Sequence, residues 1–161
     1  MKKLNILLII ITVLAFGCSD NNNFVTPISP DEQLAIDLEL IDNWLADSSI
    51  TDVLNHPSEI RYTINVKGTG IRAQVADVLR VSYEGRFLTT GEVFDSNTSF
   101  DFVLNSGSII LGWYFMLQEM EEGDTFTIYL PSQLAYGARG NGTIPPNAVL
   151  VFDITLIRVG N

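Results

Sequence analysis

Residues 150–156, LVFDITL, carry the pattern that decides the fold of this chain. Leu, Phe, Ile and Leu recur there at every second position, so one face of the segment is apolar. The same alternation recurs at residues 79–83, 100–104 and 126–130. A period of two is typical of strands that bury one face. From Tyr62 onward, the chain therefore predicts a half-buried antiparallel sheet.

One short segment inside this strand-rich region has a different pattern. Residues 112–120, GWYFMLQEM, lack the alternation and favour a helix. Gly-Asp and Pro-Pro dipeptides separate the neighbouring segments, as turns do. We therefore expect an α+β domain, in which a curved antiparallel sheet is wrapped around one short α-helix.

A longer helix is predicted ahead of the sheet and should end near Asp47. Ser29 can cap it, Pro30 suits its first position, and Glu32 completes a capping box. Two apolar stripes at helical spacing follow, formed by Leu34, Leu38, Ile41 and Leu45 and by Ile36, Leu40 and Trp44. Because so broad an apolar face must be buried, we expect the helix to dock on its own domain or to join copies of the chain.

The charge and the rare residues of the chain exclude several function classes. Nine basic residues stand against nineteen acidic ones, so phosphate backbones are repelled and a nucleic-acid partner is not expected. Anionic lipid headgroups are repelled too, so any membrane attachment must be apolar. The single cysteine, Cys18, and the single histidine, His56, exclude an intramolecular disulfide, ordinary zinc sites and Cys-His catalysis. We expect neither a metal nor a cofactor.

The start of the chain has the order of an export signal. Two lysines are followed by an almost unbroken apolar run at residues 4–16, shorter than the roughly 20 residues of a spanning helix. The string LAFGC at residues 14–18 resembles a bacterial lipobox, although its Leu lies one position further from the cysteine than usual. The resemblance implies that Cys18 is lipidated and becomes the new N-terminus. The alternative is a plain signal anchor with an incidental cysteine.

These patterns divide the chain into four parts. We expect a lipoprotein signal peptide at residues 1–17, a tether at 18–28, an N-terminal helical extension at 29–60 and the strand-rich domain at 61–161. The expected location is the cell envelope, with the protein exported and lipid-anchored. Asp20, shortly after the cysteine, favours sorting to the outer membrane.

Short strings in the strand-rich region are more specific than the alternation itself. In chain order they are VSYEG at 81–85, GEVFDS at 91–96, FDF at 100–102, IILGW at 109–113, LAYG at 134–137, IPPNA at 144–148 and LVFDI at 150–154. They resemble V-x-Y-x-G, G-x-x-F-D-S, F-x-F, V-I-x-G-W, A-Y-G, I-P-P-x-A and L-x-F-x-V of the FKBP-type peptidyl-prolyl cis-trans isomerases. Because all occur in order across residues 62–158, the chain is identified as a member of that family, in a bacterial lipoprotein form.

The resemblance implies a shallow apolar pocket between the sheet and the short helix. Trp113 would form its floor, on which a proline ring lies. The other apolar members would be Tyr83, Phe94 and Phe152 as walls, Ile109 and Ile110 along one edge, and Phe100 and Ile144 as the surround. Two groups would donate hydrogen bonds to substrate carbonyls, the Ile110 backbone N–H and the Tyr136 hydroxyl. Asp95 would be the polar group at the rim.

The implied function is cis/trans isomerisation of X-Pro bonds in envelope or exported proteins, which assists their folding and needs no cofactor. Macrolide inhibitors are implied as further ligands. The alternative is a module or holdase chaperone that binds proline-containing segments with little turnover. The chain departs from the family pattern at the short loop 97–99, at Met116 where Gly is usual, and in the loop 138–143. These differences bear on substrate preference and macrolide affinity more than on the reaction.

Overall fold

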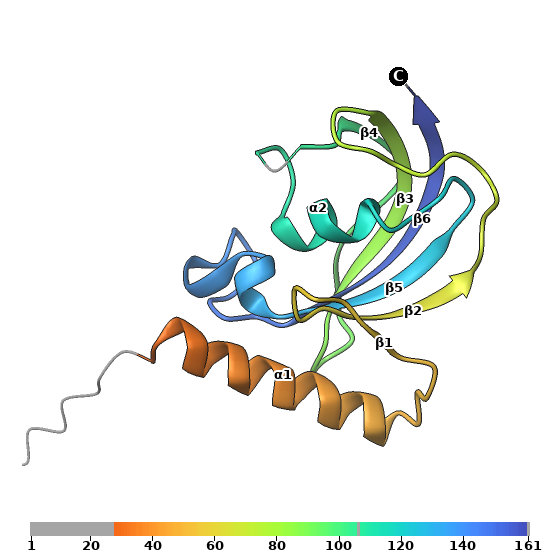
Figure 1. Cartoon of the computed structure of the whole chain (residues 1–161). Coiled ribbons are helices and arrows are strands. Elements are labelled where there is room, and N and C mark those ends of the chain that lie inside the picture. The colour runs from red at the N-terminus through yellow and green to blue at the C-terminus, as the bar shows by residue number, and fades with distance from the viewer. Residues whose placement is uncertain (1–27, 106, 161) are drawn as a thin grey trace, which may run out of the picture.

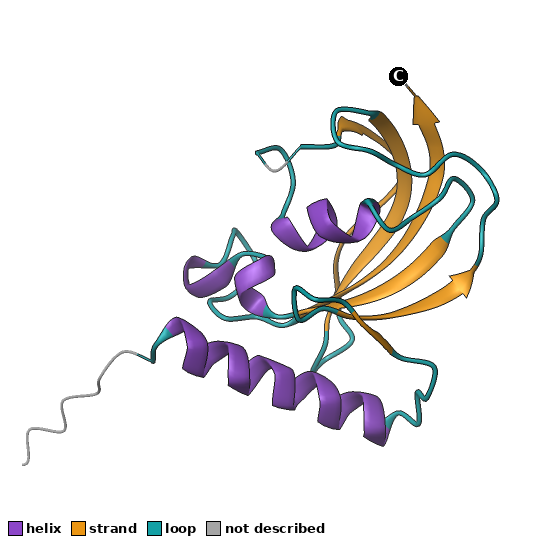
Figure 2. Ribbon diagram, in the orientation of Figure 1, coloured by secondary structure: helices purple, strands orange, loops and turns teal. Residues whose placement is uncertain are grey.

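The computed structural model describes residues 28–105 and 107–160, in which a curved sheet is wrapped around one short helix (Figure 1; Figure 2). The expected signal peptide, its lipidation residue Cys18 and all but the last residue of the expected tether lie outside these ranges. Within them, no helix combines the length and the apolar character needed to cross a bilayer.

Six antiparallel strands form one sheet in the order β1-β2-β5-β6-β3-β4. They are β1 (Leu54–Asn55), β2 (Arg61–Val66), β3 (Val78–Phe87), β4 (Val93–Val103), β5 (Thr125–Leu130) and β6 (Leu150–Gly160). The last strand, β6, therefore lies between β5 and β3 in the middle of the sheet. This arrangement and the two helices confirm the predicted fold class.

The alternating apolar residues of the strands form the inner face of the sheet. Ile128 of β5 lies opposite Phe152 of β6, and Phe126 lies opposite Ile154. All four are buried in the larger of two hydrophobic clusters. β5 departs from the predicted half-burial, because Tyr129 on its other face is also buried, beneath the N-terminal helix.

Helix α2 (Leu111–Leu117) lies on the inner face of the sheet and closes the core. It ends earlier than predicted, since the Glu119 and Met120 amides donate to carbonyls only three residues back, which forms a tight turn. Gly112 is required for the close approach of the helix to the sheet. A Cβ there would lie 2.6 Å from two side-chain carbons of Leu130.

Helix α1 (Pro30–Asp47) begins with the predicted capping box. Its C-terminal half packs on the outer side of the sheet, where Ile41 and Leu45 are buried against Leu88, Tyr129, Val149 and Val151. The Trp44 ring lies 5.7 Å from that of Tyr129. This confirms docking on the helix's own domain, and burying each aliphatic side chain is worth about 1.5–3 kcal/mol. Two residues of the second stripe, Ile36 and Leu40, remain exposed.

Two further details differ from the sequence expectation. Residues 97–99 do not form a separate loop, because β4 continues through them with a register shift opposite Val81 and Tyr83. The Ser99 amide donates to the Asn97 side chain at 2.8 Å, which stabilises this bulge. The two-residue strand β1 was not predicted, since so short a segment carries no periodicity.

Candidate active site

A hollow of about 200 Å³ opens between α2 and the inner face of β3 and β6. It is lined by Tyr83, Asp95, Phe100, Ser108, Ile109, Ile110, Trp113, Tyr136 and Phe152. These residues come from three strands, the start of α2 and two loops, so the fold is needed to assemble them. All the predicted pocket residues except Phe94 and Ile144 are among them.

Trp113 lies in the first turn of α2 and is only 5% exposed. The rings of Tyr83 and Phe152 meet its indole nearly edge-on, with centroids 4.9 and 5.4 Å away. Edge-to-face contacts of this kind are favourable between aromatic rings. Its buried indole nitrogen has no hydrogen-bond partner among the described residues. The rings of the indole contribute an aromatic surface to the hollow.

Phe94 supports the wall of the hollow from behind and does not line it. Its ring packs edge-on against Phe152, with centroids 5.6 Å apart. Gly85 of β3 makes this possible, since a Cβ there would lie 2.6 Å from Phe94 and 2.7 Å from Phe152. The string VSYEG contained this glycine, but nothing in the sequence indicated that it holds two rings in place.

Ile144 also lies away from the hollow. It is 7% exposed and belongs to the core cluster. Its backbone forms a pair of 2.9 Å hydrogen bonds with Asn141. Gly140 lies against it, and a Cβ at that glycine would be 2.3 Å from the Ile144 carbonyl oxygen. Ile144 therefore shapes the loop that follows Tyr136 and is not among the residues that line the hollow.

The rim of the hollow carries a hydrogen-bonded pair of polar side chains. The Tyr83 hydroxyl donates to a carboxylate oxygen of the exposed Asp95 at 2.7 Å. Burial, together with this carboxylate, raises the pKa of Tyr83 to about 12. The sequence identified both residues, but not that they bind each other.

Two further donors lie at the same opening. Tyr136 is half-buried, and burial, followed by the nearby charge of Asp95, raises the pKa of its phenol. Its hydroxyl therefore stays protonated at neutral pH and can donate. The Ile110 backbone N–H, just before α2, has no acceptor within the part of the chain that the structure describes.

The hollow is continuous with a second, more open groove of about 420 Å³. Residues 107–111 line one side of the groove, and Ala135 and Tyr136 line the other. Ser108, which lines both spaces, was missed in the sequence because it precedes the IILGW string and resembles an ordinary loop residue. Its hydroxyl donates to the Val103 carbonyl at 3.0 Å and thereby holds the segment that leads into α2.

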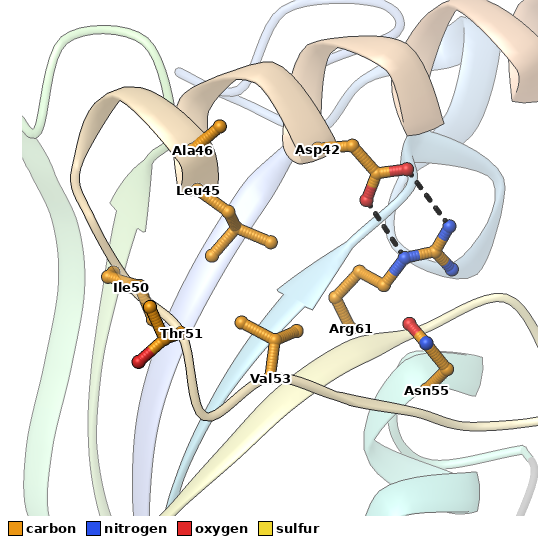
Figure 3. Close-up of a pocket in the computed structure, with 8 residues that line it drawn as sticks. All are labelled: Asp42, Leu45, Ala46, Ile50, Thr51, Val53, Asn55 and Arg61. Atoms are coloured by element: carbon orange, nitrogen blue, oxygen red, sulfur yellow. Dashed lines mark hydrogen bonds and ion pairs between the residues drawn. The ribbon is translucent and has the colours of Figure 1, made fainter.

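A separate hollow of about 350 Å³ lies between the end of α1 and β2, as Figure 3 shows. Its apolar lining is aliphatic, from Leu45, Ile50 and Val53. The Arg61 guanidinium is held by both carboxylate oxygens of Asp42, at 3.0 and 3.2 Å. None of the predicted site residues lies there. Across residues 28–105 and 107–160, no cluster of metal-ligating side chains is present either.

Comparison with known proteins gives consistent matches. A family model described as FKBP-type peptidyl-prolyl cis-trans isomerase matches residues 70–157. The FKBP-type peptidyl-prolyl cis-trans isomerase FkpA of Aeromonas hydrophila is 42% identical over 106 residues, which are 63% of this chain and 38% of that protein. The aligned region thus spans well under half of the Aeromonas protein. FK506-binding protein 2 of Candida glabrata is 39% identical over 63% of this chain and 78% of its own length.

Solved structures agree with these sequence matches. A peptidyl-prolyl cis-trans isomerase from Pseudomonas syringae superposes with a TM-score of 0.68 at 32% identity, covering 84% of this chain and 99% of its own. FkpA from Escherichia coli gives the same TM-score at 26% identity, covering 81% of this chain and 62% of its own. Because each of these structures covers more than 80% of this chain, the superpositions extend beyond residues 61–161 into the preceding segment.

Proposed function

Since this chain belongs to the FKBP-type peptidyl-prolyl cis-trans isomerase family, we propose that it catalyses rotation about X-Pro bonds in the pocket above Trp113. The observation that carries the proposal is an aromatic pocket whose opening presents two hydrogen-bond donors, the Ile110 N–H and the Tyr136 hydroxyl. The reaction needs no nucleophile, metal or general base, only a change in the surroundings of the amide.

The apolar lining acts on the resonance of the prolyl amide. Rotation breaks this resonance against a barrier of about 18–20 kcal/mol, so uncatalysed exchange takes tens to hundreds of seconds. The twisted transition state has less charge separation than the planar amide. Rings such as those of Trp113 and Phe152 therefore disfavour the planar ground state more than the transition state.

The donors at the opening hold the peptide on either side of the rotating bond. The Ile110 N–H would bind one flanking carbonyl and the Tyr136 hydroxyl another, which fixes the twisted geometry. A thousandfold acceleration requires only about 4 kcal/mol, an amount that a few such contacts can supply. The side chains of Ile109, Ile110 and Leu111 along the groove at residues 107–111 offer apolar contacts for the residue before proline, so we expect a preference for apolar X.

The test is an exchange assay on the chain from Ser29 onward, with X-Pro peptides in which X is varied. We expect the cis/trans exchange rate to rise in proportion to enzyme concentration. A folded protein that leaves exchange at the uncatalysed rate would refute the isomerase proposal. If that protein still bound the peptides, the binding module or holdase would be the better description.

We further propose that the protein acts on proline-containing segments of exported or envelope proteins while anchored through Cys18. The apolar run and the LAFGC string support this location, and two bacterial FkpA proteins are among the relatives. Multiple acyl chains, at about 0.8 kcal/mol per buried CH₂, would hold the chain on the membrane. Macrolide inhibitors remain proposed ligands of the same pocket.

The anchor is tested by metabolic labelling with a fatty acid. Cys18→Ser should abolish the label and leave an unprocessed precursor, whereas Ser19→Ala should keep both label and processing. Labelling that persists in Cys18→Ser would show that the lipobox interpretation is wrong.

A further inference from the structure

A buried carboxylate connects α1 to the segment that carries Tyr136. Asp37 lies in the second turn of α1 and is 1% exposed. One of its oxygens accepts from the Gln33 side chain at 2.8 Å. The other accepts twice from Ser132, from the backbone N–H at 2.8 Å and from the hydroxyl at 2.6 Å. The carboxylate thus joins residues that are 95 positions apart in the chain.

The three donors to Asp37 are all neutral. None of the ion pairs within residues 28–105 and 107–160 involves Asp37. A buried carboxylate is unfavourable unless its oxygens are hydrogen-bonded, so the position of the helix relative to Ser132 is tightly restricted. An apolar residue would fill this place on the helix with fewer geometric demands. The hydrogen bonds of Asp37 therefore fix the orientation of α1 relative to Ser132, which apolar packing alone would not do.

Ser132 opens the short helix η1 (Ser132–Leu134), which leads directly into Tyr136. The Leu134 amide donates to the Pro131 carbonyl and the Ala135 amide to the Ser132 carbonyl, each at 3.0 Å. A second contact joins the same elements, since the Gln133 side chain donates to the Pro30 carbonyl. The first two turns of α1 therefore hold η1 at both its first and its second residue.

Taking the proposed isomerase function as its basis, we propose that Asp37 is a positioning residue for the Tyr136 hydroxyl. By fixing Ser132, it sets the place of η1 and hence of the tyrosine four residues further on. The N-terminal half of α1 then helps to position the site, although none of its residues lines the pocket. The two halves of α1 make different contacts. Asp37 binds Ser132 of η1, whereas Ile41 and Leu45 pack on the sheet and not on η1.

A double-mutant cycle tests the proposal in the chain from Ser29 onward. Tyr136→Phe removes one hydrogen bond and should lower kcat/KM by roughly 2–13-fold. Asp37→Ala should lower kcat/KM by no more than that factor, and Asp37→Asn, which keeps one acceptor oxygen, by less. The Asp37→Ala/Tyr136→Phe double variant should be no slower than Tyr136→Phe alone. Leu45→Ala, a control that loosens α1 without touching η1, should leave kcat/KM of the folded protein unchanged.

A second measurement does not depend on activity. Amide hydrogen exchange at Leu134 and Ala135 should be faster in Asp37→Ala than in the wild type, and unchanged in Leu45→Ala. If Asp37→Ala fails to fold, Ser132→Ala, which removes only the hydroxyl donor, serves as the milder variant in both measurements. The proposal would be overturned if the losses in kcat/KM of Asp37→Ala and Tyr136→Phe multiplied in the double variant. It would also be overturned if amide hydrogen exchange at Leu134 and Ala135 stayed at the wild-type rate in Asp37→Ala. A wild type without isomerase activity would instead refute the proposed function, and the exchange measurement would still decide whether Asp37 holds η1.

Discussion

The pocket above Trp113 and the hollow beside α1 differ in chemistry far more than in size. The larger hollow, about 350 Å³ against about 200 Å³, has an aliphatic lining, and its charged groups Arg61 and Asp42 bind each other. The smaller one has aromatic walls, and its opening presents donors such as the Ile110 N–H that bind nothing else in the described chain. Volume alone therefore does not distinguish a site. An aromatic lining with hydrogen-bond donors at its opening does.

The largest effect should come from removing the floor of the pocket. Trp113→Ala should lower the free energy of unfolding by about 3–5 kcal/mol, because it opens a cavity. It should also lower kcat/KM more than tenfold, about 1.4 kcal/mol, since the proline ring loses its surface. Melting curves would give the change in stability, and cis/trans exchange assays below the melting transition would give the change in kcat/KM.

Phe126→Ala is the matched control, because Phe126 is buried in the same cluster but lies outside the pocket lining. Its loss should destabilise by a similar amount and leave the activity per folded molecule unchanged. The reverse result, an inactive but folded Phe126→Ala beside an active Trp113→Ala, would show that the site is elsewhere.

The next effect should appear at the α1 side of the molecule and be confined to stability. Leu45→Ala removes a side chain that is 5% exposed and should lower the free energy of unfolding by about 2–5 kcal/mol. Because this hollow contributes nothing to the reaction, kcat/KM should stay at the wild-type value. Urea titrations would measure the stability of the variant, and cis/trans exchange assays on the same sample would measure its kcat/KM. A lower kcat/KM in folded Leu45→Ala would contradict the conclusion that only the pocket above Trp113 serves the reaction.

A smaller effect is expected when one polar group is removed from each hollow. Tyr136→Phe should lower kcat/KM by roughly 2–13-fold with little change in stability. Asp42→Asn weakens a partly exposed ion pair and should alter the free energy of unfolding by at most about 1 kcal/mol, without an effect on rate. Equal rates for the two variants would remove the reason for placing the site above Trp113.

The sequence predicted the fold and most of the pocket, for reasons that individual residues make clear. Alternation in strands such as β6 depends only on neighbours along the chain, so it could be recognised directly. The sequence prediction placed Phe94 in the pocket lining. A sequence string gives the order of residues, but it does not show that the Phe94 ring lies against Gly85, behind the pocket wall. Asp37 gave no signal, since its partner Ser132 lies 95 positions away. Contacts of that range need the folded chain.

A further effect concerns the rim of the pocket and appears only at high pH. The pKa of Tyr83 is raised to about 12 in the folded protein, above its ordinary value of about 10. The folded chain thus binds this proton more tightly than the unfolded chain. Its contribution to stability is complete below about pH 10 and is lost as the pH rises toward about 12.

Tyr83→Phe should remove this dependence. Between about pH 10 and pH 12, the free energy of unfolding should fall less steeply in the variant than in the wild type. Tyr129 and Tyr136, whose pKa values are also raised by burial, leave a residual slope in both proteins. Urea titrations across this range would decide, and identical slopes would mean that the folded chain does not raise the pKa of Tyr83.

The central place of β6 has a consequence for the order in which the protein is made. β2 pairs with β5, and β3 pairs with β4, but these two halves of the sheet join only through β6. Residues 150–160 leave the ribosome after all the other strands, so the sheet cannot be completed earlier. Closing such distant pairs is also slow. A chain with this strand order cannot complete its sheet, and with it the larger hydrophobic cluster, until its last strand has been synthesised.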